Sequence, residues 1–527
     1  TDRLRIVQQT MDESSSFSRR GSAYALGIVP DVFINSSNWR AILTSLLEAT
    51  VPEDNPEMRD AETRVDAVIA SQNILCKITA KYSASSACGE KDDAISISDL
   101  KDAADMCLEA FLKGVEDYSV DKRGDVGSWV REASMRAFSE VLRCFQTISK
   151  CSDDSDGIVV DEYETKCTTI LGVLLKQCGE KIDRTRTVAF ESLFALLRGT
   201  VGGGGGGDDD DSHVFVSNAK DFESIQACVP VDAKDVSSEA GLQRVFSHCL
   251  TKAVLVAPYA DYALSGWVAS TGAVTESLAK AASTALLSVL SKEDERVDLK
   301  EKVARHLIET FDAYSKIDRV TVPAIRCVDV LFTGGAFDSF SLTIKTPDGA
   351  SKDYKTALSD RIRFECAGTR DVSKYILAAN ALSHVASCTD SVEAKESARL
   401  GLLAMMRNKF PRVRQIASEV LHMALSSEDD VDANTEEVMG MLTARFWEAT
   451  MNAEMKEAIH VIYAKLGLEI PKQTTAGKKD ALKTITEENI VPGVLASSKV
   501  PTTHAKKNGD TADENSSYQS LVEFSGR

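Results

Sequence analysis

The chain has 527 residues and a formal net charge of −19, and 43% of its residues are hydrophobic although only 6% are aromatic. Phosphates require a basic footprint on a protein, so this charge argues against a nucleic-acid partner. No apolar run approaches the roughly 20 residues of a membrane span, and no signal segment opens the sequence. We therefore expect a soluble intracellular protein with several domains or one repeat array. Because residue 1 is Thr rather than Met, we also expect a fragment.

Twelve cysteines and seven histidines are spread along the chain without the paired spacing of a metal site or a disulfide framework. Most of the cysteines fall on apolar helical faces, where a free thiol packs as a small hydrophobe. The sequence contains none of the familiar phosphate-loop, hydrolase, metalloprotease or kinase motifs. These patterns predict no metal, no cofactor and no catalytic residue, and they favour a binding protein over an enzyme.

Helical patterns alternate with polar connections in the first part of the chain. An amphipathic stripe covers residues 39–47, after a cluster of Asn and Ser residues that is typical of turns and helix caps. A second stripe covers 62–78, and a third helix is expected over 100–118. The polar segment 83–98 between these two helices predicts a loop.

The stretch 121–138 predicts a tight turn that leads into an amphipathic helix. Gly124 and Gly127 permit the backbone angles of a turn. Ser128 can accept hydrogen bonds from the first-turn amides, so the helix is expected to begin near Trp129. Residues three and four apart form a stripe that must be buried. This stripe consists of Val130, Ala133, Ser134, Ala137, Phe138, Val141, Leu142 and Phe145.

Three arginines of this helix lie off the apolar stripe, namely Arg131, Arg136 and Arg143. They are therefore expected to face solvent, a neighbouring repeat or a partner. Similar designs, with an arginine ahead of a small residue and an aliphatic stripe, recur at 182–189 and 410–417 and more weakly at 19–27. Helix pairs that cannot bury their apolar faces alone are expected to stack into a solenoid.

Two loops carry patterns that resemble ligand sites but do not meet their requirements. Residues 153–157 suggest a calcium loop, yet the register places Tyr163 where a bidentate glutamate is needed. The Gly/Asp stretch 202–211 matches a phosphate loop trivially, but no strand precedes it and its carboxylates repel phosphate. We interpret the first as an acidic interhelical loop and the second as a flexible insertion.

Helical patterns resume near residue 238. A proline in the pair Val322-Pro323 predicts a helix start, and 342–349 shows turn chemistry inside a loop. Further helices are expected over 372–388, 392–408, 411–425, 438–447 and 455–466. The tail beyond Pro471 has few clustered apolar residues and is expected to be disordered.

The predicted fold class is all-α, an α-solenoid of HEAT/armadillo-like helical repeats with a disordered C-terminal tail. We expect HEAT-like repeats over 1–198 and 234–470, a Gly/Asp-rich flexible insertion over 199–233, and a disordered polar tail over 471–527.

Several motifs, in order along the chain, resemble the tubulin-folding cofactor D family of HEAT-repeat chaperones. They lie at 19–30, 62–67, 121–133, 265–278, 318–323 and 410–417. The likeness covers about residues 15 to 470, and members of the family are longer at the N-terminus. The chain therefore resembles the C-terminal half of this family.

The resemblance implies a cytosolic chaperone that is associated with the microtubule cytoskeleton and captures β-tubulin. It implies cooperation with tubulin-folding cofactors C and E in heterodimer assembly, and association with an ADP-ribosylation-factor-like small GTPase. It also implies that the complex with cofactor C stimulates GTP hydrolysis by tubulin. No catalytic residue of this chain follows from the resemblance.

The candidate partner-binding residues lie in these motifs and are Arg123, Asp125, Trp129, Arg131, Arg136, Trp267, Arg412 and Arg414. Under one hypothesis the arginines of the central turn and helix present positive charge to acidic tubulin. Under the other they form repeat-to-repeat ladders with Asp121, Asp125 and Asp183. A competing functional class is a different HEAT scaffold, of the phosphatase-regulatory or transport-adaptor kind. A third is an enzyme, which requires a deep pocket with convergent titratable groups.

Overall fold

The computed structural model describes residues 15–53, 59–88, 94–151, 157–198, 219–229, 238–273, 275–291, 297–338, 340–345, 351–388, 391–428 and 431–470. In these ranges the protein is almost entirely α-helical, and its strands form two-stranded hairpins. The predicted all-α helical-repeat class is therefore confirmed. The Gly/Asp stretch 202–211, the acidic loop residues 153–156 and the tail 471–527 lie outside the described residues. None of the described helices has the length and hydropathy needed to span a membrane.

The chain divides into two compact units, with the division between Gly266 and Trp267. The helices and strands of unit 1 are α2 (Ser16–Gly27), η2 (Asp31–Phe33), α3 (Trp39–Glu48), α4 (Ala61–Cys88), α5 (Ile97–Gly114), β1 (Val120–Asp121), β2 (Gly124–Asp125), α6 (Gly127–Cys151), α7 (Gly157–Cys178), α8 (Asp183–Arg198), α9 (Phe222–Gln226), α10 (Glu239–Arg244), η5 (Val245–Leu250), α11 (Thr251–Ala253) and η6 (Ala257–Tyr259). Helix α12 (Ala260–Thr271) contains the division.

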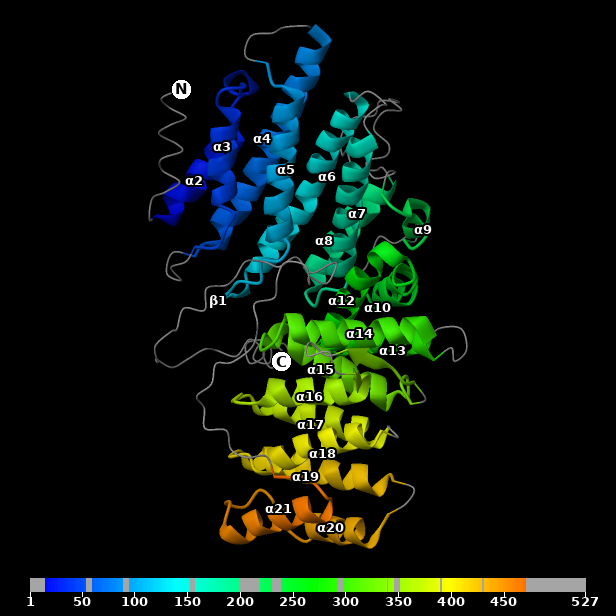
Figure 1. Cartoon of the computed structure of the whole chain (residues 1–527). Coiled ribbons are helices and arrows are strands. Elements are labelled where there is room, and N and C mark those ends of the chain that lie inside the picture. Colours follow the sequence, from blue (N-terminus) through cyan, green and yellow to red (C-terminus); the bar gives the residue numbers. More distant parts are fainter. Residues whose placement is uncertain are drawn as a thin grey trace. The chain divides into compact units, whose positions relative to one another are not determined.

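Unit 1 is built from two layers of helices (Figure 1). Helices α2, α4, α6 and α8 pack each against the next and are called layer B here. Helices α3, α5 and α7 form layer A, in which Lys101 of α5 pairs with Glu162 of α7, and Lys176 of α7 pairs with Glu116 just after α5. The order of these pairs shows that neighbouring layer A helices run parallel, as stacked helical hairpins require.

The hydrophobic core of unit 1 lies between the two layers. The predicted apolar stripe of α6 is buried along its whole length, which confirms the helical periodicity of that stretch. Phe111 of α5, Phe138 of α6 and Phe190 of α8 are among the largest fully buried side chains. Full burial of such a side chain contributes about 1.5–3 kcal/mol.

The start of α6 differs from the sequence prediction. Strands β1 and β2 form the expected tight turn, with Gly124 at a φ of 103°. The helix then begins at Gly127, and Asp125 Oδ1 accepts from the Ser128 amide at 3.0 Å. The Ser128 hydroxyl donates to the Asp125 main-chain oxygen at 2.7 Å. The prediction that Ser128 caps the helix is wrong, because the acid three residues earlier already accepts the first-turn amide.

Two other boundaries also differ. The segment predicted as a loop over 83–98 is partly helical, since α4 continues to Cys88 and α5 begins at Ile97. Its serines and alanines are compatible with a helix. Pro323 lies inside α15 (Asp318–Thr333) and not at its start. As the sixth residue of the helix it lacks one i→i−4 hydrogen bond, the one that its own amide would donate to the Arg319 main-chain oxygen.

Unit 2 repeats the helical-hairpin pattern. Helices α15, α17 and α19 pack in succession, as do α14, α16 and α18 (Figure 1). A hairpin that pairs Thr343 with Asp353 precedes α16. Besides α15, the elements are α13 (Glu276–Leu290), α14 (Val297–Ala313), β3 (Thr343–Lys345), β4 (Ser351–Asp353), α16 (Tyr354–Cys366), α17 (Val372–Ser387), α18 (Val392–Met406), α19 (Pro411–Ser426), α20 (Ala433–Thr443) and α21 (Ala453–Lys465).

Buried arginines near the start of the layer B helices connect successive turns of unit 1. Arg64 of α4 is 1% exposed, and its Nε lies 2.9 Å from Asp117 Oδ2 in the turn before α6. Its Nη1 lies 3.6 Å from Glu53 Oε2 in the turn before α4. Glu53 also pairs with Arg19 of α2 at 3.1 Å. The Glu53 carboxylate is therefore shared by arginines of two neighbouring repeats.

Arg131 continues this arginine ladder from α6. Its Nη1 donates to the Asp117 main-chain oxygen at 2.7 Å, and its Nη2 donates to Asp125 Oδ2 at 3.0 Å and lies 3.7 Å from Glu180 Oε2. Arg186 of α8 then donates to the Glu180 main-chain oxygen at 2.7 Å. Burial, which lowers the pKa of Arg131, is outweighed by the carboxylates of Glu180 and Asp125, which raise that pKa above its usual value. The buried guanidinium therefore stays charged.

Unit 2 contains a comparable connection at Arg414 of α19. This side chain is 2% exposed, and its Nε donates to the Trp447 main-chain oxygen at 3.0 Å. Its Nη1 donates to the Asn408 main-chain oxygen at 2.9 Å, and its Nη2 donates to that of Ala449 at 2.6 Å. Arg414 thus ties the turn before α19 to the segment after α20.

Replacing Arg131 with Met removes the guanidinium and leaves the buried acceptors of two turns without their charged partner. We expect Arg131→Met to lower the free energy of unfolding by about 3–5 kcal/mol, measured by urea denaturation. Arg136→Met, at an exposed position of the same helix, is the matched control and should change it by about 0.5 kcal/mol or less. Equal effects of the two substitutions would contradict the ladder.

A methyl group at Gly127 would lie 2.3 Å from the Asp117 main-chain oxygen, the atom to which Arg131 donates. We expect Gly127→Ala to lower the melting temperature, measured by circular dichroism, even though alanine favours helices. Gly21 in α2 has no atom within 4 Å of the corresponding position. Gly21→Ala should therefore stabilise by about 0.5–1 kcal/mol. Stabilisation by both substitutions would show that the close contact at Gly127 is unimportant.

Candidate docking surface on layer B

The outward stripe of α6 lies opposite its buried apolar stripe. Trp129, Glu132, Arg136, Glu140 and Arg143 follow one another at spacings of three and four residues, so they share one side of the helix. Trp129 is partly exposed and Arg136 is exposed. This stripe and the adjoining outward residues of α2, α4 and α8 are called the layer B face here.

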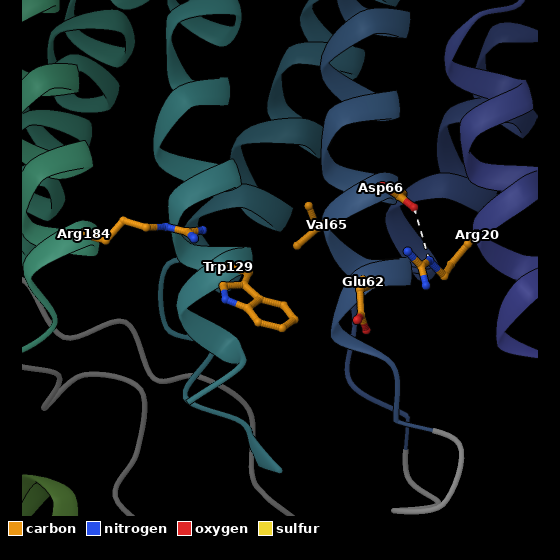
Figure 2. A pocket seen from close by; sticks show the side chains of 6 residues that line it. All are labelled: Arg20, Glu62, Val65, Asp66, Trp129 and Arg184. Atoms are coloured by element: carbon orange, nitrogen blue, oxygen red, sulfur yellow. Dashed lines mark ion pairs between the residues drawn. The ribbon is translucent and has the colours of Figure 1, made fainter. Parts of the chain in front are cut away.

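A pocket of about 320 Å³ opens at the N-terminal end of the layer B face. Figure 2 shows its lining side chains, with the Trp129 ring pointing from α6 into the space beside Val65 and Glu62 of α4. The lining residues are Arg20, Glu62, Val65, Asp66, Trp129 and Arg184. The pocket thus has two apolar walls, from α4 and α6, within a charged rim supplied by α2, α4 and α8.

Trp129 differs from the other three tryptophans of the chain. Trp39, Trp267 and Trp447 are at most 1% exposed, whereas Trp129 is partly exposed. The Arg123 guanidinium lies 4.9 Å from the Trp129 ring centroid, within the range of a cation–π interaction. A partly exposed tryptophan beside arginines has the composition of an interface hot spot.

The arginines of this face are more exposed than the carboxylates with which they pair. Arg184 is 66% exposed, whereas its partner Glu132 is 2% exposed. Arg143 is 45% exposed, whereas its partner Glu140 is 9% exposed. The guanidinium groups therefore form the outer edge of these ion pairs.

The carboxyl groups around the pocket titrate unequally. Arg123 donates to Glu62 and lowers the pKa of that carboxyl from 4.5 to about 2. Burial raises the pKa of Asp66, and the nearby Arg20, 3.7 Å from its carboxylate, offsets only part of this shift. Burial likewise raises the pKa of Glu140, partly offset by Arg143.

The structure brings three of the predicted partner-binding residues, Arg123, Trp129 and Arg136, to the layer B face. Asp125 and Arg131 belong instead to the ladder behind it. Three further predicted residues lie in unit 2. Trp267 is fully buried, and its Nε1 donates to the Ala282 main-chain oxygen at 2.8 Å. Arg412 is exposed and pairs with Glu448 at 3.4 Å. Arg414 is buried.

Sequence reasoning did not select the residues that α2, α4 and α8 contribute to the pocket. They are Arg20, Glu62, Val65, Asp66 and Arg184. A signal for most of them was present, because Arg20 and Glu62 fall in the motifs at 19–30 and 62–67, and Arg184 occurs in the recurrent segment 182–189. Aligning these segments by the start of each helix would have grouped them.

The cysteines and the potential metal ligands of the described part of the chain are mostly separate from one another. No group of three or more His, Cys, Asp or Glu side chains with the geometry of a metal site occurs among those residues. Most of their cysteines are buried thiols, and burial raises the pKa of Cys167 and of Cys366 to about 12. Protonated, buried thiols are poor nucleophiles.

Two layers of parallel helices, tied by buried arginines and presenting a broad exposed face, define a HEAT-type helical-repeat protein. The comparisons with known proteins agree with this class and make it more specific. Residues 168–374 match the family model described as tubulin folding cofactor D C terminal. Over these residues the chain matches the tubulin folding cofactor D family, as the resemblance found from the sequence motifs predicts.

Two relatives support this assignment. The tubulin-specific chaperone D of Dictyostelium discoideum is 29% identical over 198 residues, which are 34% of this chain and 13% of that protein. The tubulin-folding cofactor D of Schizosaccharomyces pombe is 32% identical over 90 residues, which are 16% of this chain and 7% of that protein. The chain therefore aligns with only a small part of the length of these relatives.

Among solved structures, the crystal structure of an engineered protein aligns with 88% of this chain and 98% of its own length. Its sequence identity is 14% and its TM-score is 0.24, so this likeness carries no argument about fold or function.

The low pKa of Glu62 predicts a pH-dependent contribution to stability. Because the folded-state pKa of about 2 lies below the ordinary 4.5, the pair with Arg123 stabilises the protein above pH 4.5, and this contribution is lost as the pH falls towards 2. We expect Glu62→Gln to lower the melting temperature at pH 7 and the difference from the parent to shrink below pH 4.5. Glu109→Gln, in an exposed pair with Lys113, is the control and should have little effect. A pH-independent difference for Glu62→Gln would contradict the assignment.

Proposed function

We propose that the chain acts as a tubulin-folding cofactor that binds β-tubulin. In this role it works with tubulin-folding cofactors C and E in post-chaperonin assembly of the tubulin heterodimer. As part of that complex it contributes to stimulating GTP hydrolysis by tubulin, without supplying a catalytic residue itself. An ADP-ribosylation-factor-like small GTPase is a further proposed partner. The proposed location is the cytoplasm, in association with the microtubule cytoskeleton.

The observation that carries this proposal is the family match over residues 168–374. It agrees with the sequence motifs, which extend beyond the matched region in both directions. The helical repeats supply physical support, because such arrays bind folded partners through an extended face made by successive repeats. A scaffold or chaperone role also fits the low number of candidate catalytic groups in the described residues.

Arg123, Trp129, Arg136 and Arg412 are the proposed partner contacts, because their side chains are at least partly exposed. Asp125, Arg131, Trp267 and Arg414 act indirectly in this proposal, by holding the turns and helices that carry those contacts.

The binding step can be tested with the whole 527-residue chain immobilised on a solid support. We expect it to retain purified tubulin, and to retain cofactors C and E from a defined mixture. A protein phosphatase catalytic subunit and a transport cargo protein, presented at the same concentration, are the negative controls and should pass through. Retention of either control together with failure to retain tubulin would favour a different HEAT scaffold.

A further inference from the structure

We propose that the outer stripe of α2 is a self-association surface, through which two copies of this chain form an antiparallel, two-fold symmetric dimer. The stripe consists of Phe17, Gly21, Tyr24 and Ile28, which follow one another at spacings of four, three and four residues and so share one side of the helix. Dimerisation goes beyond the tubulin assignment, because it concerns contact between two copies of the chain and not contact with a partner of the tubulin pathway.

The outer stripe is apolar and yet open to solvent. Helix α2 packs against α3 and α4 at the edge of unit 1 (Figure 1), and its buried residues lie on the opposite side of the helix. Together with the neighbouring η2, it has five apolar side chains that are each more than half exposed, namely Phe17, Tyr24, Ile28, Val32 and Phe33. Contiguous exposed apolar surface of this extent marks an interaction site.

The outer stripe contains no charged residue. The two arginines of α2 pair elsewhere, since Arg19 pairs with Glu53 and Arg20 pairs with Asp66 of α4. By contrast, α21, the last described helix of unit 2, has several charged or ionisable residues on its exposed side, namely Glu454, Lys456, Glu457 and His460. Terminal helices of repeat arrays that face water have such polar surfaces. The outer stripe of α2 therefore has the composition of a covered helix.

The order of side-chain sizes along the outer stripe selects a second copy of the same helix as its partner. Phe17 lies as far before the midpoint of the stripe as Ile28 lies after it, and Gly21 and Tyr24 are placed in the same way. In an antiparallel pair with its two-fold axis at this midpoint, Tyr24 of each copy faces Gly21 of the other, and Phe17 faces Ile28. A Cβ atom at Gly21 would meet nothing within 4 Å, so there is room at this position for a ring.

The exposed apolar area is sufficient for a weak dimer. An aromatic side chain buries about 150–250 Å² when it is fully covered. Five apolar side chains that are each more than half exposed therefore supply roughly 600 Å² per copy, or roughly 1,200 Å² for two copies. Specific interfaces begin at about 1,200 Å². We therefore expect an affinity in the micromolar range.

Sedimentation equilibrium of the whole 527-residue chain tests the dimer directly. A reducing agent is included because Cys76 and Cys151 are exposed thiols. We expect a reversible monomer–dimer equilibrium with a dissociation constant of about 1–100 µM, and no larger species, because a two-fold interface is closed. Each copy has a net charge of −19, so raising the salt concentration from about 50 to 200 mM should strengthen association by screening the repulsion between copies.

Tyr24→Glu should weaken dimerisation at least tenfold, because it removes the central ring and brings two carboxylates to the interface. Met423→Glu, at an exposed position of α19 in unit 2, makes the same kind of change away from the outer stripe and should leave the dissociation constant within twofold. Where Tyr24→Glu lowers the melting temperature, Tyr24→Ser replaces it and should weaken dimerisation at least threefold.

Gly21→Phe distinguishes specific pairing from unspecific apolar association. It adds exposed apolar surface to the monomer, in which nothing lies close to the new side chain. In the dimer it fills the space that Tyr24 of the second copy occupies. We therefore expect Gly21→Phe to weaken dimerisation at least fivefold, whereas unspecific apolar association would become stronger.

The antiparallel register can be tested by introducing a charge pair. Phe17→Glu and Ile28→Lys should each weaken dimerisation, because each places a charge against an apolar side chain. In the double variant Phe17→Glu/Ile28→Lys, each new carboxylate faces a new ammonium group of the other copy. We expect the double variant to dimerise at least threefold more tightly than either single variant.

Four results would overturn the proposal. They are sedimentation as a monomer or as species larger than a dimer over about 1–100 µM, equal losses from Tyr24→Glu and Met423→Glu, stronger association of Gly21→Phe, and a double variant that is no tighter than the single variants. A monomer over this range would leave the outer stripe to a helix of a different protein. Retention of tubulin does not depend on any of these results, so dimerisation and the proposed function can fail independently.

Discussion

The packing of unit 1 depends on buried arginines that satisfy the turns of two neighbouring repeats at once. Arg64 and Arg131 both bind Asp117, one through its carboxylate and the other through its main-chain oxygen. A buried charge without partners is costly, so each arginine holds its repeat in one position relative to the next. Apolar burial drives the helices together, whereas this polar network fixes their register.

The fixed register of successive repeats in turn brings together the residues of the layer B face. Because parallel layer B helices start at similar heights, residues near the first turns of α2, α4, α6 and α8 lie together around one pocket. In α6 and α8 one arginine is buried and another close by is exposed, namely Arg131 and Arg136 in α6, and Arg186 and Arg184 in α8. The arginines that tie neighbouring repeats together are thus distinct, within a single helix, from those at the surface.

Periodicity predicted the helices, the buried stripe of α6 and the repeat class, because these depend on local spacing. It could not decide which off-stripe arginine is buried, since the acceptors of Arg131 lie in turns outside α6 and leave no mark in the spacing of that helix. It also missed the inter-repeat acceptors Glu53, Asp117 and Glu180, which lie in turns without a periodic pattern. The exposed pocket depends on four helices and therefore on tertiary packing.

The short turn between α7 and α8 limits where residues can be inserted into this protein. Only residues 179–182 separate the two helices, and the Glu180 main-chain oxygen is an acceptor for Arg186. Added residues there would displace an atom on which the next repeat relies. The connection from Arg198 to Phe222, at the opposite end of α8, includes the Gly/Asp stretch. Lengthening of the chain is therefore opposed at the end of this hairpin where α7 joins α8.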